Sequence, residues 1–259
     1  MARKVIDLTT PQPNGKMGEP TKSAWEKVND MTLEIYAGLQ PAQRGFIEGL
    51  RLEYVSGNSL RFSSGAAYIE STGEVLSSPV AVTKTGISLV ASAMYHCYIY
   101  KNGASVDFEI SGSVPAIPYI GTARSKTGDT NRRYIGSFKT GASASIIKFV
   151  CAAGFQIYDV AAGSADNRLV TGNATTSTAF SISSAVPITA SLIRVAMTNT
   201  GGTGSMFLGN PGNMSFIAIF ASSVAVIDIP VQQSDLRLFY RLTSAGTAVV
   251  DCYGFNIER

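Results

Sequence analysis

The sequence runs Tyr95-His-Cys-Tyr-Ile-Tyr-Lys-Asn-Gly over residues 95–103, and this stretch decides the fold class. Aromatic and β-branched side chains are enriched in strands, and Asn-Gly favours a tight turn because both residues tolerate a positive φ. A second apolar run, at residues 106–110, follows the turn at once. The stretch therefore predicts an antiparallel β-hairpin.

Similar short apolar runs, each ended by Gly, Asn or Ser, extend from this hairpin in both directions. They occupy residues 50–55, 60–62, 66–69, 75–84, 87–101, 106–110 and 119–123, and then 179–182, 188–198, 206–208, 214–220, 224–231, 236–242 and 248–257. An apolar segment at residues 146–157 separates the two sets. This pattern is typical of antiparallel sandwiches or barrels.

Residues 20–38 show a different period. Pro20 suits the first position of a helix and Gly38 the position just past its end. Four apolar residues recur at helical spacing between them, namely Trp25, Val28, Met31 and Ile35. The pattern predicts one amphipathic helix with a single apolar stripe.

The first 18 residues form no regular pattern. Ile6 and Leu8 are apolar, but Pro11 and Pro13 with two glycines block a helix or a strand. Such an arm cannot fold alone, and a short helix is marginal in water unless its apolar stripe packs on something. The six residues Ile6, Leu8, Trp25, Val28, Met31 and Ile35, with the two prolines, are therefore the predicted docking residues.

The predicted fold class is mostly β. An extended N-terminal arm and one short amphipathic helix precede two antiparallel β-sandwich-like domains. The predicted boundaries are residues 1–45 for the arm and helix, 46–157 for the first β domain and 158–259 for the second.

Composition excludes several classes of protein. Charged residues make up 15% of the chain, the net charge is +3 and no part of the chain resembles a basic arm for nucleic acid, so we expect no nucleic-acid partner. No apolar run follows the basic residues at the start and none is long enough to span a bilayer, so we expect no secretory signal and no membrane partner. The three cysteines form no CxxC pair and are expected to be buried thiols.

Chemistry-bearing motifs are scarce. His96 is the single histidine, so a site with several imidazoles is impossible, and its place within an aromatic strand favours packing over catalysis. Acidic residues form no close cluster, and no phosphate-binding loop is present. We therefore expect no catalytic residue, no metal and no cofactor, although carboxylates from distant strands can still meet in a glycosidase.

Two further surfaces remain open to interpretation. Arg124, Arg132 and Arg133 belong to the one basic concentration. They form either an anion or nucleic-acid site, or, as we expect, a loop that pairs with carboxylates or carbonyls within or between subunits. A carbohydrate-stacking face is the alternative to core packing for Phe216, Phe220, Phe239, Tyr240, Tyr253 and Phe255.

The N-terminal segment carries a resemblance. Val5-Ile-Asp-Leu-Thr-Thr-Pro-Gln-Pro, followed by Gly18-Glu-Pro-Thr-Lys-Ser-Ala-Trp-Glu-Lys-Val-Asn, resembles the attachment segment of many tailed-bacteriophage tail fibres and related virion proteins. Gly65-Ala-Ala-Tyr-Ile-Glu, the stretch at 119–138 and the ending at 238–255 look like β modules that accompany it. The resemblance covers about half of the chain.

The resemblance implies a structural protein of the virion, assembled in the cytoplasm of a host bacterium. It implies a homo-oligomer, a trimer, that docks to other phage tail or head proteins through residues 5–38, with a host surface polysaccharide as a further candidate partner. The chain lacks room for long fibrous modules. This favours a short tail fibre or fibre adaptor, with a capsid-bound head fibre or decoration protein as the alternative and a tailspike enzyme as a third.

Overall fold

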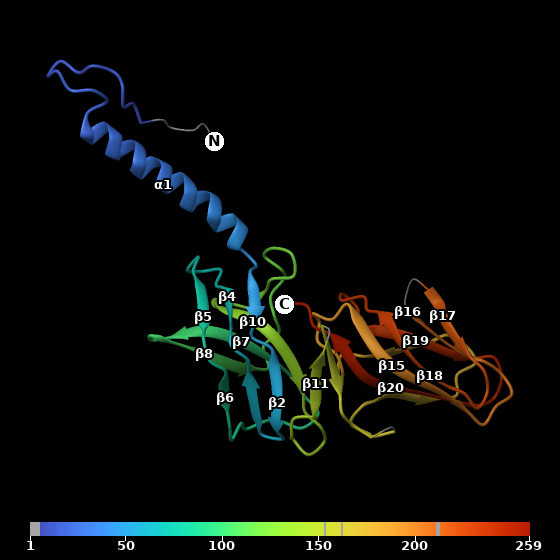
Figure 1. Ribbon diagram of the computed structural model, residues 1–259. Helices are drawn as coiled ribbons and strands as arrows, with labels where there is room; N and C mark the ends of the chain where they lie inside the picture. Colours follow the sequence, from blue (N-terminus) through green and yellow to red (C-terminus); the bar gives the residue numbers. More distant parts are fainter. Residues whose placement is uncertain (1–5, 153, 162, 211–212) are drawn as a thin grey trace.

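The computed structural model describes residues 6–152, 154–161, 163–210 and 213–259, and shows a mostly β protein (Figure 1). Within these residues there are one helix and twenty strands, all paired antiparallel. The strands lie in two groups side by side, and the C-terminal residues lie between the groups. This confirms the predicted fold class. Residues 1–5 of the predicted arm lie outside the described residues.

The helix α1 spans Thr21–Gln43 and leads away from the β sheets (Figure 1). Its start, just after Pro20, agrees with the sequence, but the predicted end at Gly38 is wrong by five residues. A glycine inside a helix costs only ~1 kcal/mol relative to alanine, and the residues that follow include good helix formers, so Gly38 does not end the helix. The helix gives way at Gly45, which has a φ of +90°.

The N-terminal half contains three small sheets, ordered β1-β4-β5, β2-β3-β6 and β8-β7-β10-β9. The strands are β1 Ile47–Gly49, β2 Leu52–Ser56, β3 Ser59–Phe62, β4 Gly65–Tyr68, β5 Val75–Ser78, β6 Val82–Lys84, β7 Met94–Asn102, β8 Ser105–Ser111, β9 Ser125–Lys126 and β10 Asp129–Lys139. Phe62 and Phe108 meet edge to face at 5.0 Å in its core, and both are fully buried.

The predicted central hairpin is β7–β8, with one difference at its turn. Asn102 pairs with Ser105, so Gly103 and Ala104 form the loop, and of these only Gly103 has a positive φ, of +60°. The strand predicted at residues 119–123 is absent. A single bridge joins Ile120 to Ala123 there, because the chain turns back within four residues and leaves no length for a strand.

The C-terminal half is a sandwich of a six-stranded sheet, β11-β12-β20-β15-β18 with β13 also on β20, and a four-stranded sheet, β14-β19-β16-β17. The strands are β11 Phe149–Ala152, β12 Phe155–Tyr158, β13 Arg168–Gly172, β14 Thr178–Ser181, β15 Leu192–Thr200, β16 Met206–Asn210, β17 Asn213–Ile219, β18 Val224–Pro230, β19 Arg237–Leu242 and β20 Thr247–Asn256.

Fully buried side chains fill the space between these two sheets, with Val195, Met197 and Val250 on one and Leu208 and Leu238 on the other. The glycine-rich stretch 201–204 is not the tip of a hairpin, although short apolar runs flank it. It joins β15 to β16, which belong to different sheets. Apolar runs alone do not distinguish a hairpin from a crossing between sheets.

The hairpin β11–β12 pairs with β20 through Phe155 and Asn256. Strand pairing therefore groups it with the C-terminal sheet, whereas the predicted boundary between residues 157 and 158 falls at its end. The two halves meet through hydrogen bonds as well as apolar contacts. Lys139 donates to the carbonyl of Asp166, and Arg124 donates to the side chain of Gln233 at 3.2 Å.

Candidate functional sites

The N-terminal arm folds back on itself, which its sequence did not predict. The Asp7 carboxylate accepts the backbone N–H groups of Thr9 and Thr10 at 2.8 and 3.1 Å. Hydrogen bonds from Thr10 and Thr9 lower the pKa of Asp7 to about 2. The backbone N–H of Gly18 then donates to the Thr10 carbonyl at 2.8 Å. The arm is thus a small closed loop with its own hydrogen bonds.

Glu19 ties this loop to α1. Its carboxylate forms an ion pair of 2.5 Å with Lys27, accepts a hydrogen bond of 3.3 Å from Ser23, and accepts another of 3.3 Å from the backbone N–H of Asp7. A carboxylate beside the first turn of a helix is also favoured by the helix dipole. The ion pair and hydrogen bonds of Glu19 therefore join the arm and the start of α1 into one unit.

The predicted docking residues lie on this unit, largely uncovered. Leu8 is 75% exposed, Trp25 62% and Ile35 58%. Pro11 and Pro13 are exposed, whereas Ile6, Val28 and Met31 are half-buried. On α1, the spacing of three and four places Trp25, Val28, Met31 and Ile35 on one side of the helix. The structure thus brings the helical residues together into one stripe, called the α1 stripe below.

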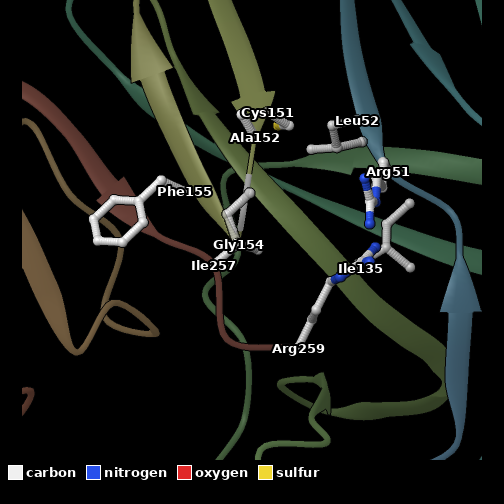
Figure 2. Close-up of a pocket in the computed structure, with 9 residues that line it drawn as sticks. All are labelled: Arg51, Leu52, Ile135, Cys151, Ala152, Gly154, Phe155, Ile257 and Arg259. Carbon is white, nitrogen blue, oxygen red and sulfur yellow. The ribbon is translucent and has the colours of Figure 1, made fainter.

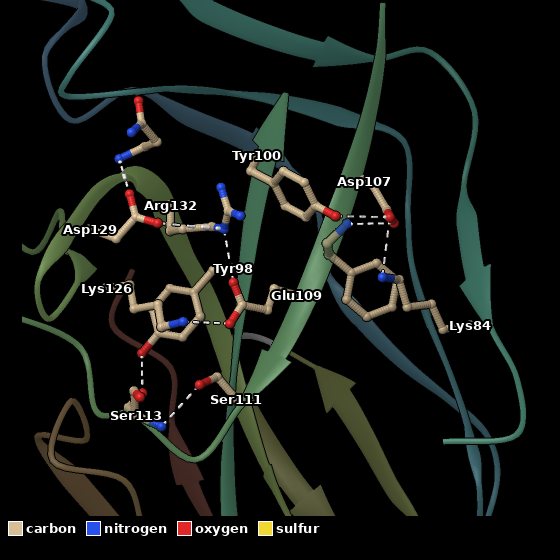
Figure 3. Close-up of polar contacts among 12 residues, drawn as sticks. Lys84, Tyr98, Tyr100, Asp107, Glu109, Ser111, Ser113, Lys126, Asp129 and Arg132 are labelled. Atoms are coloured by element: carbon tan, nitrogen blue, oxygen red, sulfur yellow. Dashed lines mark hydrogen bonds and ion pairs between the residues drawn. The ribbon is translucent and has the colours of Figure 1, made fainter. Parts of the chain in front are cut away.

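A ladder of alternating charges covers one side of the N-terminal half (Figure 3). Glu109 on β8 lies between Lys126 at 2.5 Å and Arg132 at 2.8 Å. Burial alone would raise the pKa of Glu109, but hydrogen bonds from Lys126 and Arg132 lower it. The guanidinium carbon of Arg132 also lies 3.9 Å from the ring centre of Tyr100, and the Nε of Arg132 lies 3.8 Å from the Asp129 carboxylate.

The ladder continues to Asp107, which accepts one hydrogen bond of 3.3 Å from the Tyr100 hydroxyl and pairs with Lys84 at 3.2 Å. The three cations Lys84, Lys126 and Arg132 are thus matched by three carboxylates. Such balanced pairs leave little net field to attract a polyanion. The ladder is therefore suited to holding neighbouring strands rigidly together.

Arg133 and Arg124 point inward. Arg133 is 1% exposed, and its guanidinium donates to the carbonyls of Arg124, Tyr134 and Gly45 at 3.2 to 3.3 Å. Burial lowers the pKa of Arg133. Arg124 is 7% exposed and donates to the carbonyl of Ala116 at 3.0 Å. Both arginines pair within the chain, mainly with carbonyls, and Arg133 fixes the segment that follows α1.

His96 belongs to a buried chain of hydroxyl groups between the halves. Its Nδ1 lies 2.7 Å from the Ser137 hydroxyl, which is 2.8 Å from that of Tyr134, which is 2.9 Å from that of Thr189. Burial lowers the pKa of His96 to about 4. No carboxylate belongs to this chain of contacts, so it lacks the third group that orients an imidazole base in a catalytic triad.

The thiols and carboxylates form no metal centre in the part of the chain that the structure describes, where no three His, Cys, Asp or Glu side chains gather. Cys97 and Cys252 are fully buried and Cys151 is partly buried. Burial raises the pKa of Cys252 to about 12 and that of Cys151 to about 11. Protonated thiols of this kind are poor nucleophiles.

Of the six aromatic residues considered for a sugar-binding face, the five whose side chains the structure describes do not share one. Tyr240 and Phe255 are buried in the core of the sandwich. Phe220 is 78% exposed, but Phe239 and Tyr253 lie on strands of different sheets. The side chain of Phe216 lies outside the described residues.

A small cavity between the two halves escaped prediction (Figure 2). It measures about 80 Å³, and its wall includes Arg51, Cys151, Phe155 and Arg259. These residues come from segments far apart in the sequence and carry no common motif, so no local pattern could have indicated the site.

Comparison of the chain with protein-family models and with curated proteins gave no match. No helix in the described part of the chain is long and apolar enough to cross a membrane.

Proposed function

We propose that this chain is a non-enzymatic structural protein of a tailed-bacteriophage virion, a tail fibre or fibre adaptor that docks through residues 5–38. The observation that carries the proposal is the exposure of the α1 stripe, with Trp25 at 62% and Ile35 at 58%, on a helix that leads away from the sheets. The resemblance of residues 5–29 to phage attachment segments supports the same role.

Physical chemistry supports docking through this unit. A helix of 23 residues is ~35 Å long and marginal in water by itself. Burying an apolar side chain of Trp or Ile size contributes ~2 kcal/mol. A partner that covers the α1 stripe would therefore bind the helix and stabilise it through the same apolar contacts. Copies of this chain in a trimer, and other proteins of the particle, are the partners in the proposal.

The β halves supply the rigid body of the proposed fibre or adaptor. In the N-terminal half the charges of the ladder are paired, and in the C-terminal half Arg194 and Asp228 form a double hydrogen bond of 2.8 Å. The proposal assigns these groups to strand-to-strand contacts and assigns no reaction to them.

Particle incorporation tests the proposal. In a phage lacking the gene, the double variant Trp25→Ala/Ile35→Ser supplied from a plasmid should reduce the amount of this protein in purified particles at least tenfold, since each tenfold corresponds to ~1.4 kcal/mol of binding. The matched control is Val224→Ala/Val226→Ser, which changes two valines that are 66% and 62% exposed on β18.

Each variant protein should retain the wild-type free energy of unfolding, because the four side chains are exposed. Wild-type incorporation of the helix variant, or of a protein lacking residues 1–38, would exclude docking through this segment. Electron microscopy of the particles with a gold-labelled antibody assigns the protein to the tail, as proposed, or to the capsid, which would refute the tail assignment.

A further inference from the structure

The cavity between the halves holds two positive charges that face each other. Figure 2 shows the guanidinium groups of Arg51 and Arg259 directed toward one another across it. Arg259 donates a hydrogen bond of 2.8 Å to the Leu50 carbonyl. Burial, and next the charge of Arg51, lower the pKa of Arg259. The two cations therefore repel each other, with Arg259 partly buried and Arg51 exposed.

Among the described residues, neither arginine forms an ion pair with an Asp or Glu side chain. Of the two carboxylates nearest in sequence, Glu258 accepts a hydrogen bond of 3.1 Å from Gln233, and Glu53 forms an ion pair of 2.5 Å with Arg61. The other side chains that line the cavity are uncharged, with those of Leu52, Ile135 and Phe155 among the apolar ones. Apolar walls reduce screening by water, which strengthens both the repulsion between the arginines and their attraction for an anion.

We propose that this cavity is a binding site for one small oxyanion, a phosphate, sulfate or carboxylate group, held between the guanidinium groups of Arg51 and Arg259. Guanidinium presents paired N–H donors that match two oxygens of such a group. A cavity of about 80 Å³ admits a single group of this size and excludes a folded polyanion. This site is independent of the docking role of residues 5–38.

The anion would join the two halves. Arg51 directly precedes β2 in the N-terminal half, whereas Arg259 follows β20 and Cys151 lies on β11 in the C-terminal half. A ligand held by both arginines replaces a repulsion across the interface with two attractions. The bound form should therefore unfold at a higher temperature than the free form.

Thermal unfolding with inorganic phosphate, sulfate or acetate, each compared with chloride at equal ionic strength, tests the proposal. Phosphate or sulfate should raise the midpoint for the full chain in a saturable way, and acetate reports whether a carboxylate suffices. Arg51→Gln and Arg259→Gln should each weaken the apparent affinity about tenfold or more. Arg237→Gln, a matched loss of one exposed charge on β19, should leave it unchanged.

Alkylation of Cys151 gives a second measurement at the site. Cys97 and Cys252 are 0% exposed, so the reagent reaches Cys151 first. Burial raises the pKa of Cys151, whereas Arg259 and Arg51 lower it. A bound oxyanion blocks the cavity and cancels the effect of the arginines, and both effects should slow the reaction.

Two results would overturn the site. One is a stabilisation by phosphate and sulfate no greater than that by chloride. The other is an equal response of the wild type, Arg51→Gln and Arg237→Gln, which would indicate adventitious binding elsewhere. Arg51 is exposed, so its replacement keeps the fold and the comparison remains decisive even if the Arg259 variant is unstable.

Discussion

Mild acid should destabilise the protein through one imidazole, that of His96. This side chain is 2% exposed and belongs to β7, and the hydroxyl of Ser137 on the neighbouring strand β10 is its hydrogen-bond partner. The ring of Tyr134 is its other close neighbour, at 6.3 Å between ring centres. Burial raises the pKa of Tyr134 to about 12, so both neighbours are uncharged in acid and neither compensates a positive imidazole.

The sign and size follow from the pKa of His96, which burial lowers from 6.5 to about 4. Between these two values the unfolded chain binds a proton and the folded chain does not, so stability falls as the pH falls through this window. The difference between 6.5 and about 4, at ~1.4 kcal/mol for each pKa unit, amounts to ~3 kcal/mol. Above pH 6.5 the histidine contributes no further change.

The measurement is urea unfolding of the wild type and of His96→Gln at a series of pH values across this window. The single tryptophan lies on α1, so circular dichroism is the better signal for the sheets. Carboxylates titrate in both proteins alike, and the difference between the two free energies of unfolding isolates His96. If the two proteins lose stability in parallel from pH 6.5 to about 4, the reasoning is refuted.

The same unfolding assay checks two further predictions, both at neutral pH. Arg133→Ala should lower the free energy of unfolding by ~3 kcal/mol or more, because it leaves buried carbonyls without donors. Arg132→Ala, at the partly exposed neighbouring position, should lower it by only ~1 kcal/mol. Equal losses in the two variants would contradict this reasoning. Gly49→Ala should cost at least twice as much as Gly103→Ala, for which the positive φ alone costs ~1 kcal/mol. A Cβ at Gly49 would lie 2.2 Å from the Ser64 carbonyl oxygen but would meet nothing at Gly103, so a smaller cost at Gly49 would contradict the packing described.

Sequence patterns predicted the local elements well where one local force dominates. The aromatic and apolar residues of β7 and the glycine of its turn determine the hairpin within about 15 residues, and the structure shows it there. The apolar spacing that begins at Trp25 likewise predicted α1. Its end was missed because Gly38 is only weakly unfavourable in a helix, and because α1 continues even through Pro41, although proline ordinarily breaks a helix.

Contacts between distant segments could not be predicted in the same way. Arg133 stood out as one member of a basic cluster, but its burial against the carbonyl of Gly45 depends on how the β10 sheet meets the end of α1. Arg51 and Arg259 are 208 positions apart and neither belongs to a motif. A cavity formed by such residues exists only in the assembled fold, and periodicity carries no information about it.

The pairing of β20 has a consequence for synthesis on the ribosome. The sheets of the N-terminal half pair only residues within 47–139, so that half can close as soon as this stretch has emerged. By contrast β12, β13 and β15 each pair with β20, and must wait for residues 247–256. At ~10 residues per second their apolar edges stay open for several seconds. The C-terminal sandwich is therefore where we expect nascent chains to need chaperones, and where truncation within β20 would leave three strands without their partner.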